Sequence, residues 1–385
     1  MNRIFFLLFA INAIAPISRG ACWQEDQRNT ESAALESITF SKDSVEQTIR
    51  GQVVVQAKDG GVLLEDRSGT LWTVKADQLK AREATGGQFK LFSKEERIAA
   101  LKPELGEGFS TLATKHYLIA YNTDPAYAEW CSELLERFYA GYFAYWKKLK
   151  LDLHEPDSLL TVIIFRNKDE FQAFYEADVG QKTQSSFGYY SIRRNRSVLY
   201  DFSGLEGDDR KKVASIKRAM KKVPFNLSTI VHEGTHQLAF NSGLHTRYAD
   251  NPVWLTEGIA MLFEAPDFGS KKWTAIGRLT DWRKNTLSGK LTQLDANSLS
   301  QLTQSDDRFR SEETANHAYA EAWGLTLFLM NRRKKQFTEY IKAVGKKPPL
   351  IWDKPEERLK LFSDLIGEPE ELQTPLQSYL KRRKI

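Results

Sequence analysis

Residues 231–236, VHEGTH, place two histidines four positions apart, with a glutamate directly after the first. On an α-helix, positions i and i+4 lie on one face, so His232 and His236 can bind one zinc ion. Glu233 then lies beside the same site, where a carboxylate can serve as a general base. The chain contains 6 histidines in 385 residues, which makes a chance H-E-x-x-H sequence improbable.

The flanking residues predict the ends of this helix. Ser228 is a candidate N-cap, because its hydroxyl can accept a backbone N–H of the first turn. Gly243, in the sequence Asn-Ser-Gly at 241–243, is a candidate left-handed C-cap. We therefore expect a helix of about 14 residues, near the usual length in globular proteins.

A catalytic zinc ion usually has three protein ligands and one open position, so a third ligand is expected. The best candidate is Glu257, in PVWLTEGIAMLFE at 252–264. The intervening residues suffice for a loop and the start of a second helix, which Thr256 or Asn251 could cap. A carboxylate in an apolar helix needs a partner, and zinc would supply one. The alternative is a solvated or capping glutamate.

HEGTH followed by WLTEGIAMLFE resembles the gluzincin class of zinc metallopeptidases, whose ligands are two histidines and a downstream glutamate. More narrowly, the chain resembles the peptidase MA-like and DUF1570 group of secreted bacterial proteins. Further segments carry this resemblance: HYLIAYNTDPAYAEWCSELLERFY at 116–139, GYYSIRRNRSVLYDFSG at 188–204 and AYAEAWGLTLFL at 318–329. It covers residues 110–350 approximately and implies a metallopeptidase-like site without a substrate.

The resemblance also implies that His317 and Tyr319 lie near the site, where either could stabilise an oxyanion. Tyr248 is a weaker third candidate, and packing or surface exposure explains all three equally well. Thermolysin-like enzymes have an acidic residue four positions after the ligand glutamate, but here that position is Met261. The zinc-binding histidines must be oriented from elsewhere, and Glu264 is one option. The remaining histidines are interpreted as structural or surface residues: His116, His154 and His245.

Residues 1–20 have the pattern of a secretion signal, with Arg3, an apolar stretch and small residues at the expected cleavage site. This predicts a secreted or periplasmic protein. Cys22 could carry a lipid anchor, although Arg19 fits a lipoprotein signal poorly. Secretion also permits a disulfide between Cys22 and Cys131, whereas a buried, inert thiol is the alternative for Cys131.

The formal net charge of +5 is mild, and 41% hydrophobic residues can form a large core. Nucleic acid is not an expected partner, because aromatic and basic residues do not interleave. Basic clusters are most simply solvated surface, with an anionic envelope polymer or membrane surface as a minor alternative. After the signal, no stretch has the length and apolarity of a transmembrane helix.

The sequence predicts an α+β fold: a zincin-like domain at 109–385 with C-terminal helices, preceded by a small all-β, barrel-like module at 38–82. A flexible leader at 21–37 and a linker at 83–108 complete the division. Strands at 187–191 and 197–202 should form a hairpin, and residues 198–202 are our candidate for an edge strand that pairs with substrate backbone.

We therefore expect a zinc peptidase with one Zn²⁺ per chain, bound by His232, His236 and Glu257, with Glu233 as the general base. Its partner would be a peptide or protein substrate. Two alternatives stay open. One is a non-catalytic zinc protein that binds an envelope component through the β module. The other is a zinc hydrolase that acts on a non-peptide bond.

Overall fold

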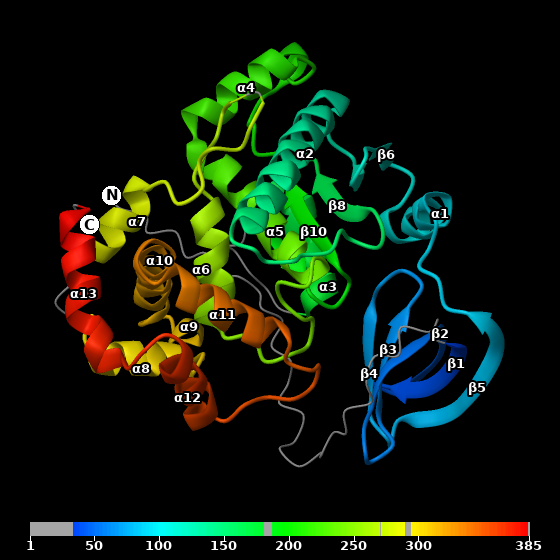
Figure 1. The fold of residues 1–385 in the computed structure, drawn as a ribbon. Coiled ribbons are helices and arrows are strands. Elements are labelled where there is room, and N and C mark those ends of the chain that lie inside the picture. The colour runs from blue at the N-terminus through cyan, green and yellow to red at the C-terminus, as the bar shows by residue number, and fades with distance from the viewer. Residues whose placement is uncertain (1–33, 181–186, 270, 289–293, 384–385) are drawn as a thin grey trace.

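The computed structural model describes residues 34–180, 187–269, 271–288 and 294–383 (Figure 1). The predictions for the secretion signal, Cys22 and most of the leader lie outside these ranges. The fold is α+β, as predicted, with an N-terminal all-β module and C-terminal helices. No helix in the described ranges combines the length and apolarity needed to cross a bilayer.

Two sheets contain all ten named strands. They are β1 (Ala34–Lys42), β2 (Val45–Gln56), β3 (Val62–Asp66), β4 (Leu71–Val74), β5 (Leu79–Gln88), β6 (Ser110–Ala113), β7 (Tyr117–Tyr121), β8 (Leu160–Phe165), β9 (Gly188–Ser191) and β10 (Arg196–Tyr200).

Helices account for most of the remainder. They are α1 (Lys94–Leu105), α2 (Pro125–Lys148), α3 (Lys168–Val179), a 3₁₀ turn (Gly207–Asp209), α4 (Val213–Lys222), α5 (Pro224–Asn241), α6 (Val253–Phe263), α7 (Asp281–Ser288), α8 (Ala296–Gln304), α9 (Asp307–Arg310), α10 (Ala315–Arg332), α11 (Lys334–Gly345), α12 (Pro355–Leu365) and α13 (Pro369–Arg382).

The first sheet forms the N-terminal module, with antiparallel strands in the order β4-β3-β2-β1-β5. Its apolar face buries five side chains around Phe40 and Leu64. The strands run from residue 34 to residue 88, so the sheet is larger than the predicted module at 38–82. The predicted linker at 83–108 contains the end of β5 and the helix α1.

The second sheet has the order β6-β7-β8-β10-β9, with a parallel centre and an antiparallel strand at each edge. Alternate residues of its strands enter two different cores, since successive side chains of a strand point to opposite faces. On β7, Ile119 joins the core with α2 and α5, whereas Leu118 joins a core with α1 and α3. Helices therefore cover both faces of this sheet.

The predicted hairpin is present as β9 and β10, but the prediction of residues 198–202 as an edge strand is wrong. Strand β10 pairs with β8 on one side and with β9 on the other, so both of its edges are used. In the described chain, β9 pairs only with β10 and is the edge. The chain forms the edge strand β9 first, and the hairpin then turns it inward to β10 beside β8. The alternation of apolar residues alone does not reveal this order.

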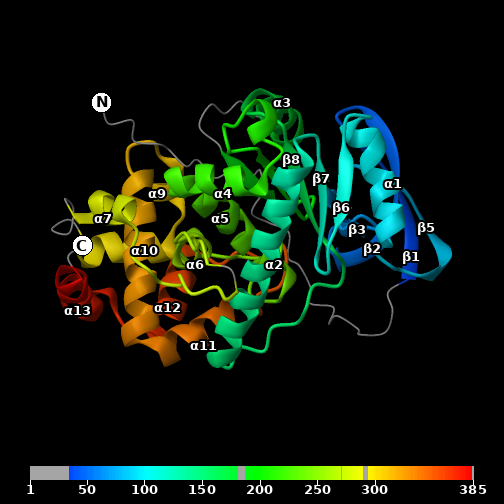
Figure 2. The same cartoon turned by 90° about the horizontal axis from the view of Figure 1, so that it is seen from above.

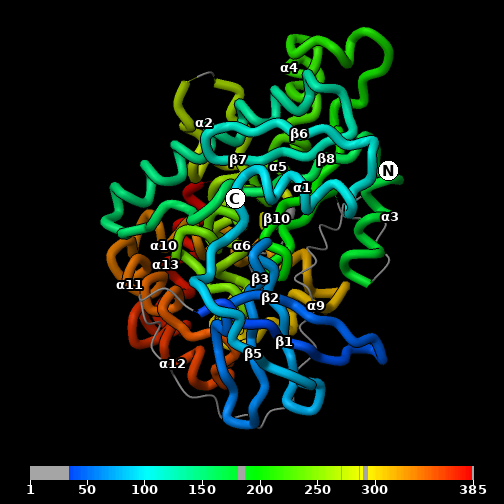
Figure 3. Tube along the Cα trace, turned by 90° about the vertical axis from the view of Figure 1, so that its right-hand side faces the viewer, coloured from blue at the N-terminus to red at the C-terminus, as the bar shows by residue number. Residues whose placement is uncertain are grey.

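The C-terminal helices extend the core of α2 and α5 on the side away from the β module, as Figures 1 and 2 both show. Figure 3 shows α4 and the β module at opposite ends of the molecule. The module packs on the main domain through a small apolar cluster that includes Leu63, Leu71, Tyr248 and Leu350. Arg247 crosses the same contact, because its guanidinium lies 2.6 Å from Glu65 and donates to the Gly69 carbonyl.

Candidate metal centre

Helix α5 carries the H-E-x-x-H sequence, but it begins earlier than predicted. Pro224 occupies the first turn, where a missing N–H costs nothing. The prediction of Ser228 as N-cap is wrong, because Ser228 lies inside the helix and its hydroxyl donates to the Pro224 carbonyl. The predicted C-terminal end is confirmed: the helix ends at Asn241, and Gly243 has a φ of +81°.

Helix α6 carries Glu257 and packs between α5 and α10. Neither Thr256 nor Asn251 caps it, contrary to prediction. Instead, Asp306 accepts a hydrogen bond from the Val253 backbone N–H at 3.0 Å. A carboxylate at this position satisfies an unpaired amide and complements the positive end of the helix. The cap comes from a segment far along the chain, so the local sequence could not reveal it.

The two helices bring His232, His236 and Glu257 together. Their candidate ligand atoms all lie within 4.8 Å of one another. The Nε2 atoms of the two histidines are 3.1 Å apart, and the Glu257 oxygens lie 3.2 Å from His232 and 3.4 Å from His236. Tetrahedral ligands about 2.0–2.1 Å from a zinc ion are separated by roughly 3.4 Å. The three side chains are thus already spaced to bind one small metal ion.

The environment of Glu257 supports the same reading. This side chain is 1% exposed, and neither of its carboxylate oxygens has a hydrogen-bond partner in the described structure. Burial disfavours its charged form, but His236 and His232 hold its pKa at about 2. A buried carboxylate stays ionised only beside compensating positive charge, which the protonated His232 supplies in the metal-free chain and a bound cation would supply in its place. The donor set of two imidazoles and one carboxylate fits a divalent metal, and zinc in particular.

A second carboxylate orients His232. Glu264, directly after α6, has Oε2 3.2 Å from Nδ1 of His232, on the side of the ring opposite Glu257. Arg283 of α7 holds Glu264 by two hydrogen bonds of 3.0 and 3.1 Å. Such partners fix the tautomer and orientation of a metal-binding histidine. The option of Glu264 is therefore supported by geometry, whereas the role of Arg283 was not predicted from the sequence.

Glu233 lies beside the cluster without joining it. Its Oε1 has no hydrogen-bond partner in the described structure, and the side chain is 1% exposed. Burial raises its pKa, although the two histidines and the Tyr190 backbone N–H oppose that change. Strand β9 approaches closely, because a Cβ on Gly188 would lie 3.5 Å from Cγ of Glu233. The sheet edge therefore runs directly past this carboxylate.

The three candidates for oxyanion stabilisation lie in different places. Tyr319 of α10 is buried, and burial with the charges of Glu257 and Glu233 raises its pKa well above 10. His317 lies two positions earlier, about 200° around the helix, so the two side chains leave on different faces. No hydrogen bond or ion pair of the described residues joins His317 to the cluster. Tyr248 packs in the contact with the β module.

The remaining histidines and Cys131 occupy structural positions. His116 stacks on Tyr139 and lies 2.6 Å from Glu136, and His154 lies 3.0 Å from the Glu155 carbonyl. His245 is buried, and burial lowers its pKa to about 3. Burial raises the pKa of the Cys131 thiol to about 12, which favours the inert thiol over a reactive one.

Comparison with known protein families gives one match, which covers the part of the chain that contains the candidate metal ligands. No curated protein matches the chain significantly. A family model described as "Protein of unknown function (DUF1570)" matches residues 226–351, which include α5, α6 and α10. The quoted segment at 318–329 lies within that match, and those at 116–139 and 188–204 lie before it. The predicted resemblance to DUF1570 is confirmed for residues 226–351, which include all three candidate metal ligands.

Proposed function

We propose that this protein is a zinc-dependent peptidase of the gluzincin type, with a zincin-like domain and one Zn²⁺ per chain. The observation that carries the proposal is the buried group of His232, His236 and Glu257, whose ligand atoms are spaced for one tetrahedral ion. The resemblance of the sequence to gluzincins and to peptidase MA-like proteins adds to it. A purely structural site would have no use for the free carboxylate of Glu233.

Bound zinc would supply Lewis acidity, which acidifies water and polarises a carbonyl group. Glu233 would take a proton from the attacking water and deliver it to the leaving amine. Its burial and its unpartnered Oε1 suit this role, because a raised pKa favours proton exchange near neutral pH. Tyr319 would remain protonated and could donate a hydrogen bond to the oxyanion.

Strand β9 replaces residues 198–202 as the candidate for substrate pairing. It is the last strand of the sheet order and passes close to Glu233. An extended peptide could add to this edge through main-chain hydrogen bonds and place its carbonyl beside the base. Export from the cytoplasm, as residues 1–20 suggest, would give such an enzyme peptide substrates in the envelope or outside the cell.

The first experiment is elemental analysis of the purified chain and two variants, His236→Ala and Glu257→Ala. We expect about one zinc per wild-type chain and loss of zinc from both variants. His116→Ala is the matched control, because His116 also lies against a glutamate but outside the cluster. No zinc in the wild-type chain after reconstitution would reject the proposal.

The second experiment separates a peptidase from a non-catalytic zinc protein. Glu233→Gln should retain zinc and lose hydrolysis of a peptide library read by mass spectrometry. Zinc without any hydrolysis by the wild-type chain would favour a binding protein, or a hydrolase that acts on a different bond.

A further inference from the structure

Four arginines gather where α10 and α13 end side by side. Arg332 is the last residue of α10 and Arg333 follows it, while Arg382 is the last residue of α13 and Arg383 follows it. Arg332 lies thirteen positions beyond Tyr319 on the same helix, which is roughly 20 Å along the axis. This cluster is therefore remote from the candidate metal centre.

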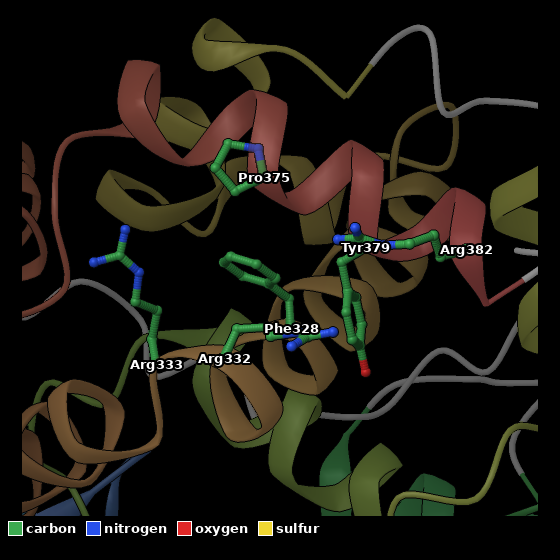
Figure 4. Close-up of a pocket in the computed structure, with 6 residues that line it drawn as sticks. All are labelled: Phe328, Arg332, Arg333, Pro375, Tyr379 and Arg382. Atoms are coloured by element: carbon green, nitrogen blue, oxygen red, sulfur yellow. The ribbon is translucent and has the colours of Figure 1, made fainter.

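Three of these arginines border a shallow, open hollow of about 210 Å³. Its lining residues are Phe328, Arg332, Arg333, Pro375, Tyr379 and Arg382. Figure 4 shows Phe328 between Pro375 and Arg332, with Arg333 on one side and Tyr379 and Arg382 on the other. The base is apolar and aromatic, whereas the charged groups stand at the rim.

Aromatic contacts hold two of the guanidinium groups in place. Arg332 and Arg383 lie with Cζ 5.8 and 5.4 Å from the centre of the Tyr379 ring, which is a favourable cation–π distance. Tyr379 is itself buried against Phe328, with their ring centres 5.7 Å apart. The positions of the charges are thus partly fixed before any ligand arrives.

Among the described residues, the arginines of the cluster have no acidic partners. No described carboxylate forms an ion pair with Arg332, Arg333, Arg382 or Arg383. Elsewhere the chain pairs its arginines closely, as in Arg247 with Glu65 and Arg308 with Glu321. A single exposed arginine without a partner is ordinary. Three that line one hollow, with Arg383 beside them, repel one another, and an anion would reduce that repulsion.

Helix ends explain only part of this arrangement. Basic residues in the last turn stabilise a helix, because they complement its negative end. Helix α4 ends in the same way, with Lys221 and Lys222. Stabilisation of helix ends does not explain why basic residues from both α10 and α13 border one hollow.

We propose that the hollow between the C-terminal ends of α10 and α13 binds a phosphate or phosphate-ester group. Arginine favours this chemistry, because its planar fork of N–H donors matches two phosphate oxygens at once. The cavity is small, so it would take the charged group itself and leave the rest of a larger ligand outside. The proposal does not depend on the peptidase function.

The test is calorimetric titration of the purified chain with inorganic pyrophosphate at low ionic strength. We expect saturable binding that weakens about tenfold for each arginine removed, in Arg332→Gln and Arg382→Gln, because each loses a charge-assisted hydrogen bond. The matched control is Lys221→Gln with Lys222→Gln, which removes two charges from another helix end. Equal weakening in that control would overturn the proposal, as would the absence of binding both to pyrophosphate and to the lipid vesicles described below.

A second variant leaves all the arginines in place, so a loss of binding cannot result from a folding defect caused by their removal. Pro375→Glu keeps all four arginines and adds a carboxylate at the rim, so it should abolish binding, while Thr374→Glu next to it should not. His236→Ala must bind pyrophosphate as well as wild type, since a metal at the other site would also attract phosphate. Circular dichroism checks that each variant is folded.

A further experiment determines whether the bound phosphate group belongs to a lipid headgroup or to a soluble compound. Phosphatidylcholine vesicles with and without phosphatidylglycerol are sedimented with wild type and with Arg332→Gln/Arg382→Gln. Binding that needs both phosphatidylglycerol and the arginines assigns the site to lipid headgroups. Pyrophosphate binding without vesicle binding assigns it to a soluble phosphate compound. Absence of both rejects a phosphate site.

Discussion

The imidazole of His232 lies between two carboxylates of one helix end, with Nε2 3.2 Å from Glu257 and Nδ1 3.2 Å from Glu264. Glu257 and Glu264 are seven positions apart, which is two turns, so they lie on one side of α6. Glu264 can accept the Nδ1 proton, and the lone pair of Nε2 is then directed at the metal position.

Glu264→Gln should weaken zinc binding by about 10- to 100-fold, as loss of partners behind metal-binding histidines usually does. The amide is nearly the same size, but it forms a weaker hydrogen bond to His232 and no ion pair with Arg283. Competition with a chromophoric chelator measures the affinity. Glu321→Gln is the control, because Glu321 forms a two-bond pair with Arg308 that touches no candidate ligand. Equal effects of both changes would show that only general stability is lost.

Zinc binding should release a proton from His232. Burial disfavours the charged imidazole, but Glu257 and Glu264 together raise the pKa of His232 to about 9 in the metal-free chain. His232 therefore carries a proton at pH 7, and zinc must displace it. Because zinc must displace the proton of His232, the zinc affinity should rise about tenfold per pH unit from pH 7 to pH 9 and level off above pH 9.

Calorimetry in buffers with different ionisation enthalpies counts the released protons. We expect His232 to contribute about one proton at pH 7.5 and none at pH 10. Glu264→Gln should move the midpoint of this release to lower pH, since it removes one of the two carboxylates that raise the pKa. A pH-independent affinity between pH 7 and 9 would contradict the assignment.

Gly258→Ala should destabilise the protein and weaken zinc binding together. A Cβ at this position would lie 2.0 Å from Oγ1 of Thr326 and 3.1 Å from the Ala322 carbonyl, so α6 and α10 must move apart. Overpacking of this kind costs about 1–3 kcal/mol or more. Glu257 is the adjacent residue and would shift with its helix. Thermal unfolding and the zinc affinity measure the two effects.

Two further variants test this contact. Thr326→Ala removes the nearer atom, an oxygen that is buried without a hydrogen-bond partner, so the double variant should recover part of the stability. Gly108→Ala is the matched control, because a Cβ there meets no atom within 4 Å. No recovery in the double variant would place the strain elsewhere.

Local sequence patterns predicted those parts of the fold and site that depend on local chemistry. The spacing of His232 and His236 requires only a helix, and Gly243 ends that helix as a residue free to adopt positive φ. The apolar pattern of AYAEAWGLTLFL at 318–329 lies wholly within helix α10, at Ala315–Arg332. Each of these predictions uses residues within a few turns of one another.

The parts that were missed depend on long-range packing. Strand β5 is almost wholly exposed and carries no apolar alternation, so only its pairing with β1 makes it a strand. Helix α7 begins only at Asp281, and Trp273 before it packs from a loop against Gly141 of α2. Arg283 reaches Glu264 only through this arrangement, and no local pattern marks it as part of the site.

Arg247→Met should loosen the β module. The Arg247 and Glu65 side chains are only 12% and 16% exposed, and the same guanidinium donates to the Gly69 carbonyl. Removal of the charge leaves Glu65 partly buried without a cation, which should cost about 2–3 kcal/mol. We expect a lower midpoint of thermal unfolding and faster proteolysis near residues 88–93, where β5 ends before α1.

The control for this change is Arg67→Met. Arg67 also joins the module to the following segment, 2.9 Å from Glu96, but its side chain is 33% exposed and that of Glu96 is 44% exposed. Exposed pairs contribute about 0–1 kcal/mol, so this variant should unfold close to wild type. If the two variants lose equal stability, burial does not set the strength of the Arg247 contact. If neither changes the proteolysis pattern, the apolar cluster around Tyr248 holds the module without help from the arginine.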